Sequence, residues 1–295
     1  MKHLTSTKDL TNDEILEIFE DASFFLENKE SDVLSNKNII TIFFENSTRT
    51  LSSFESAAKR LNAKVLRLDV SRSSSSKGET LLDTISNLNS MSPDAIIIRH
   101  MHSGIPHYIK NYVNCPILNA GDGKHAHPTQ ALLDLFTIYK YFNKQIKDKK
   151  ILIVGDIKNS RVATSNIELL QRFGIKILLA GPKHFMPNIN LPKYTNLKDC
   201  IDEVDIIMSL RTQTERHHKA IYGSLKDYAS DYCINENLLK DKNIILMHPG
   251  PVNRNIDIDD QMLKDKRSLV LEQVKNGVAV RMAVLKKLVL DNKGV

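Results

Sequence analysis

The segment Glu45–Thr50 (ENSTRT) combines three hydroxyl side chains with a guanidinium group. It lies between an apolar run typical of a buried strand and a stretch whose apolar spacing predicts an amphipathic helix. A helix N-terminus attracts anions through its free amides, and arginine can bind phosphate through two hydrogen bonds. The segment could therefore bind a phosphate. The alternative, in which Ser47 or Thr48 only caps the helix and Arg49 is solvated, stays open on this pattern alone.

A serine-rich loop, Ser71–Thr80 (SRSSSSKGET), is a second segment that could wrap a phosphate. It is not a Walker A loop, because the glycines of GxxxxGK[ST] are missing. A flexible polar linker before the next helix is the other interpretation, and this stretch by itself favours the linker.

An arginine and two histidines of the first half could polarise a carbonyl oxygen. Arg99 ends an apolar strand pattern together with His100, and the carboxyl ends of parallel strands form the binding edge of a sheet. His125 and His127 lie in the glycine-bearing loop GDGKHAHPTQ. They could form a metal pair, but the sequence shows no third ligand. A neutral histidine that donates a hydrogen bond to a carbonyl oxygen is the favoured interpretation.

The second half carries arginines that could bind a dicarboxylate. Arg161 and Arg211 each follow a predicted strand, so both could face one cleft. The segment before Arg161 reads GDIKNSR and lacks GxGxxG, which counts against a dinucleotide site. His248–Pro251 (HPGP) follows another strand, whereas Arg216 could equally lie on the surface.

Strand and helix patterns that alternate along the chain must position these residues. The expected strands are 38–44, 64–69, 94–100, 116–120, 150–156, 175–180, 205–210 and 243–248. The expected helices are 47–61, 80–90, 129–142, 160–173, 221–229, 235–240 and 267–290. The alternation predicts an α/β fold of two doubly wound domains, each a mostly parallel sheet flanked by helices, with the active site in the inter-domain cleft.

The composition is that of an ordinary globular protein, with 295 residues, 41% of them hydrophobic and 26% charged. Three scattered cysteines (Cys115, Cys200 and Cys233) exclude a disulfide framework and a CxxC zinc site. No signal peptide is evident and no stretch approaches the ~18 apolar residues of a membrane span, so we expect a cytoplasmic protein with no membrane partner. The net charge of +6 without a dense basic block favours small anions over nucleic acid.

Five motifs together carry a family resemblance: FFENSTRT, SKGET, the Arg99-His100 pair, LNAGDG with HPTQALLDLFTI, and HPGPVNR. In order and spacing they resemble the aspartate/ornithine carbamoyltransferase family over nearly the whole chain. The resemblance implies an enzyme that transfers the carbamoyl group of carbamoyl phosphate to the amine of L-aspartate. The products would be N-carbamoyl-L-aspartate and phosphate, in pyrimidine biosynthesis. It also implies that no metal, cofactor or covalent nucleophile takes part.

The resemblance also implies site residues for carbamoyl phosphate. The positions that match phosphate contacts are Ser47, Thr48, Arg49 and Thr50. The groups that polarise the carbonyl oxygen match Thr50, Arg99 and His127. The contacts of the carbamoyl NH2 match Gln130 and the backbone carbonyls of Gly250 and Pro251.

For aspartate, the matching positions are Arg161, Arg211 and Gln213. Ser73 and Lys77 match a loop that the family donates from a neighbouring subunit, so Lys77 would serve both substrates and the chain would form a homotrimer with shared sites. Whether regulatory chains join that trimer is left open. Domain closure would link Glu45 with Arg161 and Arg216.

The resemblance also sets the expected domains, because in the family the C-terminal helix returns to the first one. We expect a carbamoyl-phosphate-binding domain of residues 1–134 plus 279–295 and an aspartate-binding domain of residues 135–278. Leu51 stands where many members have Arg, and Gly250 replaces a larger apolar residue. His100-Met101 lacks the proline that follows in some relatives.

Two alternative functions remain. An ornithine carbamoyltransferase would carry HCLP and SMG segments, whereas this chain has HPGP and the arginine-bearing SLRTQTER. An extra arginine repels a cationic acceptor and attracts a carboxylate, so aspartate is favoured over ornithine or another amino acid. A non-catalytic homologue that only binds carbamoyl phosphate is the second alternative. The intact set of Thr50, Lys77, Arg99, His127 and Arg211 counts against it.

Overall fold

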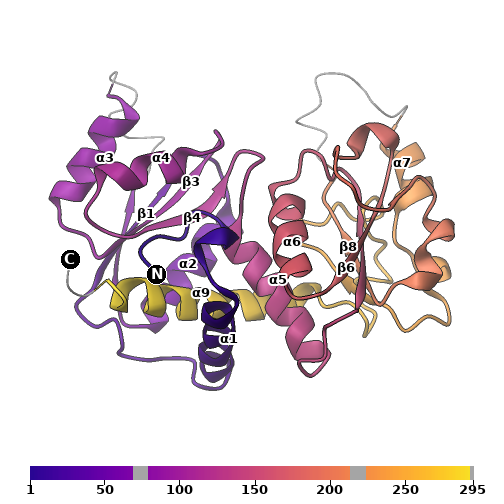
Figure 1. Cartoon of the computed structure of the whole chain (residues 1–295), viewed down its shortest axis with the longest axis horizontal. Coiled ribbons are helices and arrows are strands. Elements are labelled where there is room, and N and C mark those ends of the chain that lie inside the picture. The colour runs from indigo at the N-terminus through magenta and orange to yellow at the C-terminus, as the bar shows by residue number, and fades with distance from the viewer. Residues whose placement is uncertain (69–78, 213–223, 293–295) are drawn as a thin grey trace. The chain divides into compact units, whose positions relative to one another are not determined.

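The apolar runs of the first half form a four-stranded parallel sheet, sheet 1 (Figure 1). Its strands are β1 (Asn38–Phe43), β2 (Lys64–Leu68), β3 (Ala95–His100) and β4 (Ile117–Asp122), in the order β2-β1-β3-β4. β3 and β4 are buried along their whole length, as continuous apolar runs of a sheet covered on both faces should be. β1 lies in the middle of the sheet, with β2 beside it toward one edge and β3 beside it toward the other edge. The topological switch point of sheet 1 therefore lies between β1 and β3.

Helices cover both faces of sheet 1. The helices of this half are α1 (Asn12–Glu27), α2 (Thr48–Arg60), α3 (Leu81–Ser90), α4 (Ile105–Ile109) and α5 (Pro128–Tyr141). The C-terminal helix α9 (Val270–Leu290) joins them. One face is covered by α3 and α4, whose Ile85, Leu88 and Ile109 pack on Ile40 and Ile96. Figure 1 shows α1, α2 and α9 on the other face.

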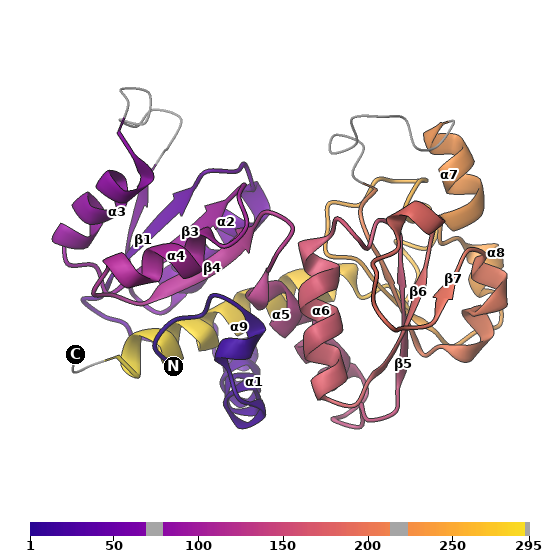
Figure 2. The ribbon, with the colours of Figure 1, turned by 45° about the horizontal axis from the view of Figure 1, so that its top comes forward.

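The second half forms a five-stranded parallel sheet, sheet 2, in the order β7-β6-β5-β8-β9. Its strands are β5 (Lys150–Val154), β6 (Lys176–Ala180), β7 (Lys193–Tyr194), β8 (Ile206–Ser209) and β9 (Ile245–Met247). Figure 2 shows α6 (Arg161–Arg172) on one side of this sheet and α7 (Leu225–Tyr232) with α8 (Glu236–Leu239) on the other. The switch point lies between β5 and β8, since β6 and β7 wind one way and β9 the other.

The structure, a computed structural model, describes residues 1–68, 79–212 and 224–292. Its contacts divide the chain into unit 1 (Met1–Phe136 with Lys275–Val295) and unit 2 (Thr137–Val274). Short 3-10 helices complete the list of elements: Thr7–Asp9, Lys110–Tyr112, Lys183–Phe185, Leu197–Asp199 and Ile201–Glu203. The predicted class of two parallel α/β domains is confirmed, while the substrate-based boundaries 1–134 with 279–295 and 135–278 remain a prediction.

The sequence patterns missed three elements. α1 has apolar residues at the expected spacing, and its N-terminus carries a capping box in which Thr11 accepts from the Glu14 amide. It packs beside α9, where Lys286 pairs with Asp21 at 2.6 Å and Lys287 with Glu17 at 2.9 Å. α4 has five residues and β7 two, too short for a periodic pattern to show. The expected helix 221–229 lies later in the structure, as α7, and residues 221–223 fall outside the described part.

Candidate active site

The predicted functional residues of each unit follow the strands that flank its switch point. In sheet 1, Ser47–Thr50 follow β1, and Arg99 lies at the end of β3. In sheet 2, Arg161 follows β5 and Arg211 follows β8. Connections leave such a point toward opposite faces, so the strand ends there stay open to a ligand. Both sheets thus place cationic side chains where α/β proteins bind ligands.

The N-terminus of α2 differs from those of the capped helices. Ser47 is its N-cap residue, but its hydroxyl makes no capping bond and instead contacts Thr50 Oγ1 at 3.0 Å. By contrast, the hydroxyls of Thr11 and Ser160 accept the third amide of α1 and α6. The Ser47 hydroxyl therefore does not occupy the first-turn amides of α2, which is the arrangement an anion site needs.

Arg99 is held beside this segment. Its side chain is buried, its Nη1 donates to the Ala120 carbonyl at 3.1 Å, and its Nε lies 3.5 Å from Glu45 Oε2. The Phe44 amide in turn donates to the Arg99 carbonyl at 2.9 Å. These contacts bring the segment after β1 and the end of β3 together, and a shared anion site there stays a prediction. Glu45, expected to take part in domain closure, lies within unit 1 beside Arg99.

His127 and Gln130 lie at the start of α5 and are buried. Gln130 Nε2 donates to the buried Asp134 Oδ1 at 2.9 Å, which fixes the amide so that Oε1 points away from that carboxylate. Oε1 is the atom that can accept a carbamoyl NH2. The sequence analysis missed Asp134, although its position four residues after Gln130 on a helix is the signal that could have found it.

A buried arginine of α9 stands near Asp134. Arg281 Nη1 donates to Ser53 Oγ at 2.9 Å and to the Gly277 carbonyl at 3.2 Å. Burial lowers the pKa of Arg281 to about 10, and the attraction of Asp134 opposes that shift. Arg281 thereby links the C-terminal helix to Ser53 of α2.

The other titratable groups near the first site have separate partners. His125 is half exposed, and its Nδ1 lies 3.0 Å from Asp122 Oδ2. The described residues contain no group of three or more His, Cys, Asp or Glu side chains arranged to bind a metal ion. Burial lowers the pKa of His100, whose Nδ1 accepts from the His102 amide at 2.9 Å. Burial also raises the pKa of Cys115 to about 11 and, in unit 2, that of Cys233 to about 11 and of Cys200 to about 12, which disfavours the thiolate form of each.

The second unit holds its own cationic and backbone groups. Arg161 is the first residue of α6 and is buried, and Arg211 is partly exposed just after β8. Gly250 has a φ of 68°, a conformation that glycine adopts without strain, and its amide donates to His248 Nδ1 at 2.8 Å. This positive φ accounts for a glycine at position 250, where some family members have a larger apolar residue. Ser73, Lys77, Gln213 and Arg216 lie outside the described residues.

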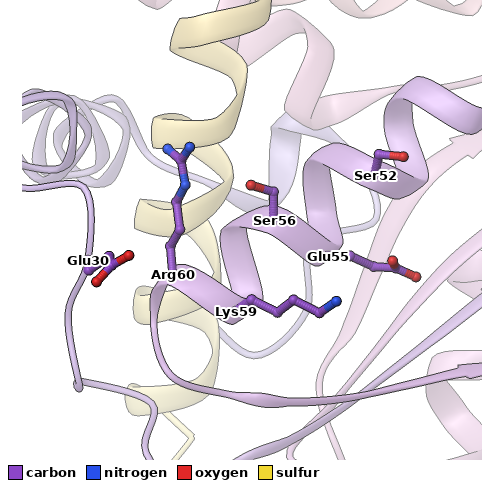
Figure 3. Close-up of a pocket in the computed structure, with 6 residues that line it drawn as sticks. All are labelled: Glu30, Ser52, Glu55, Ser56, Lys59 and Arg60. Atoms are coloured by element: carbon purple, nitrogen blue, oxygen red, sulfur yellow. The ribbon is translucent and has the colours of Figure 1, made fainter.

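A cavity of about 370 Å³ on unit 1 is separate from the predicted residues. It is lined by Glu30, Ser52, Glu55, Ser56, Lys59 and Arg60 (Figure 3). Two acidic and two basic side chains balance there, and Glu55 already pairs with Arg67. None of the predicted phosphate contacts lines this cavity, so we do not assign the substrate site to it.

Comparison with known proteins identifies the family. Residues 2–140 match the carbamoyl-P binding domain and residues 147–288 the Asp/Orn binding domain of aspartate/ornithine carbamoyltransferases. The chain belongs to the aspartate/ornithine carbamoyltransferase family. It is 66% identical, over the whole length of both chains, to the aspartate carbamoyltransferase catalytic subunit of Campylobacter jejuni subsp. doylei.

Solved structures agree with this assignment. The catalytic subunit of M. jannaschii aspartate transcarbamoylase superposes with a TM-score of 0.90 at 36% identity, with all of both chains covered. The Trypanosoma cruzi enzyme in complex with N-(phosphonacetyl)-L-aspartic acid gives a TM-score of 0.89 at 31% identity, covering 97% of this chain and 95% of that one. None of the described helices has the length and apolar character to span a bilayer.

Replacing Ser47 by alanine should weaken anion binding at little cost in stability. Because its hydroxyl caps no amide, we expect S47A to lower the free energy of unfolding by less than about 0.5 kcal/mol. The control T11A removes a true cap and should cost about 1 kcal/mol. Urea unfolding and calorimetric titration with inorganic phosphate measure both effects. An S47A cost equal to that of T11A, with phosphate affinity unchanged, would make Ser47 a structural cap.

Proposed function

We propose that this protein transfers the carbamoyl group of carbamoyl phosphate to the amine of L-aspartate, giving N-carbamoyl-L-aspartate and phosphate in pyrimidine biosynthesis. The observation that carries the proposal is the pair of arginines, Arg161 and Arg211, that follow the two strands of the sheet 2 switch point. Two guanidinium groups suit the two carboxylates of aspartate and would repel the ammonium group of ornithine.

Most of the proposed contacts of carbamoyl phosphate belong to unit 1. The phosphate would accept hydrogen bonds from the first-turn amides of α2, from the hydroxyls of Ser47, Thr48 and Thr50, and from Arg49. The carbonyl oxygen would lie near Thr50, Arg99 and His127, and the NH2 near Gln130 Oε1 and the Gly250 and Pro251 carbonyls. The Trypanosoma cruzi relatives bound to carbamoyl phosphate, and to carbamoyl phosphate with aspartate, support these ligand classes.

The reaction then needs positioning and charge stabilisation. The unprotonated amine of aspartate attacks the carbamoyl carbon, a C–N bond forms, and negative charge develops on the former carbonyl oxygen. Arg99, His127 and Thr50 would stabilise this oxyanion, a contribution that grows only in the transition state. The bond from carbon to phosphate oxygen breaks, the departing phosphate takes the proton that the amine gives up, and the cationic phosphate site stabilises that phosphate.

The assembly and the setting are part of the same proposal. We place Ser73 and Lys77 in the site of a neighbouring subunit of a homotrimer, with Gln213 beside aspartate and the protein in the cytoplasm. Closure of the two domains would bring Glu45 toward Arg161 and Arg216 and exclude water from the site. Purification of the protein from its own cells would show whether regulatory chains bind the trimer.

The test compares two acceptors. Purified protein is given carbamoyl phosphate with L-aspartate or L-ornithine at equal concentration, without added metal, and phosphate release is measured with product mass. We expect N-carbamoyl-L-aspartate from the first reaction and no product from the second. Ornithine-dependent turnover would mean that the arginines of unit 2 have been misassigned. Binding of carbamoyl phosphate without turnover on either acceptor would favour a non-catalytic homologue.

Removal of the His127 donor should slow the chemical step. If His127 stabilises the oxyanion, H127A should lower kcat by roughly 10²–10³-fold, with melting temperature near that of the wild type. The control H125A removes the neighbouring half-exposed histidine, which pairs with Asp122, and should keep kcat within a few-fold. Steady-state kinetics of both variants decide the role, and an unchanged kcat in H127A would make it a structural histidine.

Shared sites predict complementation between two inactive chains. R49A removes a phosphate contact of the chain's own site, and K77A removes a group donated to the neighbouring site, so each homotrimer should be nearly inactive. Mixed trimers contain some interfaces with both residues intact, so activity should reappear after the two variants are unfolded and refolded together. Mixed trimers verified by native mass spectrometry that show no recovery would contradict site sharing.

A further inference from the structure

One buried carboxylate connects two segments of unit 2, of which one carries a proposed aspartate contact and the other the proposed carbamoyl contacts. Asp257 is 1% exposed and lies beyond β9. The segment after β8 carries Arg211, and the loop after β9 carries Gly250 and Pro251. Residues 210–212 after β8 and 248–253 after β9 belong to no helix or strand, so something other than a regular backbone ladder must hold these residues in place.

Both oxygens of Asp257 are filled by donors from these segments. Oδ1 accepts from the Thr212 amide at 3.1 Å and from the Thr212 hydroxyl at 2.9 Å. Oδ2 accepts from the Asn253 amide at 2.8 Å and lies 3.3 Å from His248 Nε2. Two donors on each oxygen meet the accepting capacity of a buried carboxylate.

His248 extends this network to Gly250. Its Nδ1 accepts the Gly250 amide at 2.8 Å, so that nitrogen carries no proton and Nε2 carries the hydrogen that faces Asp257. The backbone amide of His248 donates to Gln273 Oε1 at 2.9 Å. A continuous chain of hydrogen bonds therefore runs from the Asp257 carboxylate through a buried imidazole to the backbone of Gly250.

The main chain around Asp257 adds a second set of links. Its carbonyl accepts from the Ser209 hydroxyl at the end of β8 at 3.2 Å and from the Ile234 amide at 3.1 Å. Asn253 Nδ2 donates back to the Thr212 carbonyl at 3.0 Å. Thr212 is thus held at both its amide and its carbonyl, immediately after Arg211.

We propose that Asp257 is the positioning residue of the acceptor half of the site. It touches no substrate in this role. It fixes the segment of Arg211 relative to the loop of Gly250 and Pro251, so that the aspartate contact and the carbamoyl contact keep one spacing. We call this set of hydrogen bonds to Asp257 the clamp. Its effect on catalysis rests on the proposed function, whereas its existence follows from the distances around Asp257.

An amide cannot replace this carboxylate. In D257N one of the two oxygens becomes an NH2 group, which faces two donors of the protein whichever way the side chain is turned. At least two of the four hydrogen bonds to the side chain at position 257 are lost, and the new NH2 group faces N–H or O–H donors that it cannot accept from. The segments of Arg211 and Gly250 should then move independently, and small displacements of a binding group cost large factors in rate.

The expected result in D257N is a loss of about 10- to 100-fold in kcat/KM for aspartate. Inorganic phosphate affinity should change by less than twofold, because its proposed contacts lie in unit 1. The control is D205N, at the other end of β8, where Asp205 accepts from Lys149 Nζ at 2.8 Å and from the Lys150 amide at 2.9 Å. D205N should lower the melting temperature and leave both KM values unchanged.

A second variant covers the case in which D257N does not fold. T212V removes the hydroxyl donor but keeps the Thr212 backbone amide and the side-chain volume, so it should fold and raise KM for aspartate by a smaller factor. A folded T212V or D257N with wild-type KM for aspartate and wild-type kcat would overturn the inference, as would a D205N that reproduces the D257N kinetics.

Amide hydrogen exchange separates this inference from the proposed function. D257N or T212V should speed exchange at residue 212 and at Gly250 and Asn253, with the β5 amides unchanged. If the wild-type protein does not carbamoylate aspartate, the proposed function is wrong. The exchange rates then test by themselves whether Asp257 holds the two segments together. Unchanged exchange at those three amides would reject the clamp whatever the acceptor is.

Discussion

Each proposed substrate contact depends on the way buried parallel strands end. All strand pairs of sheet 1 and sheet 2 are parallel, so within each sheet the carboxyl ends of the strands meet at a single edge. At one place in each sheet the following connections leave toward opposite faces, between β1 and β3 and between β5 and β8. Only there can helix N-termini and polar side chains reach a ligand without crossing another helix. The fully buried cores of β3 and β5 make those strand ends stiff supports.

Polar groups near these edges are buried and must therefore be bonded. Asp122 accepts from Gly104 and Ala126 amides and from Asn119 Nδ2, at 2.6, 3.1 and 2.8 Å. Asp134 orients Gln130, and Asp257 joins the loops after β8 and β9. A buried carboxylate without such donors would cost several kcal/mol, so each one selects a single arrangement of the loops around it. The carboxylates thus supply order to segments that have no ladder hydrogen bonds.

The C-terminal helix contributes through an arginine that no substrate needs to touch. Arg281 is enclosed by α9, α2 and the Phe54 ring, whose centroid lies 4.9 Å from Cζ. Desolvation disfavours its charge, and hydrogen bonds to Ser53 and Gly277 with the nearby Asp134 offset that cost in part. One cation of α9 therefore joins the C-terminal helix to α2, the helix that begins just after Ser47.

The sequence by itself determined the two parallel sheets and most of the helices, and it placed the hydroxyl-rich segment Ser47–Thr50 at the start of a helix. These features follow from local spacing, because apolar periodicity and capping residues act within a few positions of the chain. It missed α1, although the spacing of Ile15, Ile18 and Phe19 was there to be read, and it missed α4 and β7 because they are too short to repeat.

Tertiary structure alone decided which donors surround Asp257, that the Ser47 hydroxyl makes no capping bond at the start of α2, and that Arg281 is buried. Thr212 lies 45 residues before Asp257 in the chain, yet both of its donors reach the same carboxylate oxygen. No local pattern encodes such a pairing, because it depends on where β8 and β9 end in the folded sheet. The residue types in the sequence indicate which chemical groups are present. The packing of distant segments sets the distances between those groups.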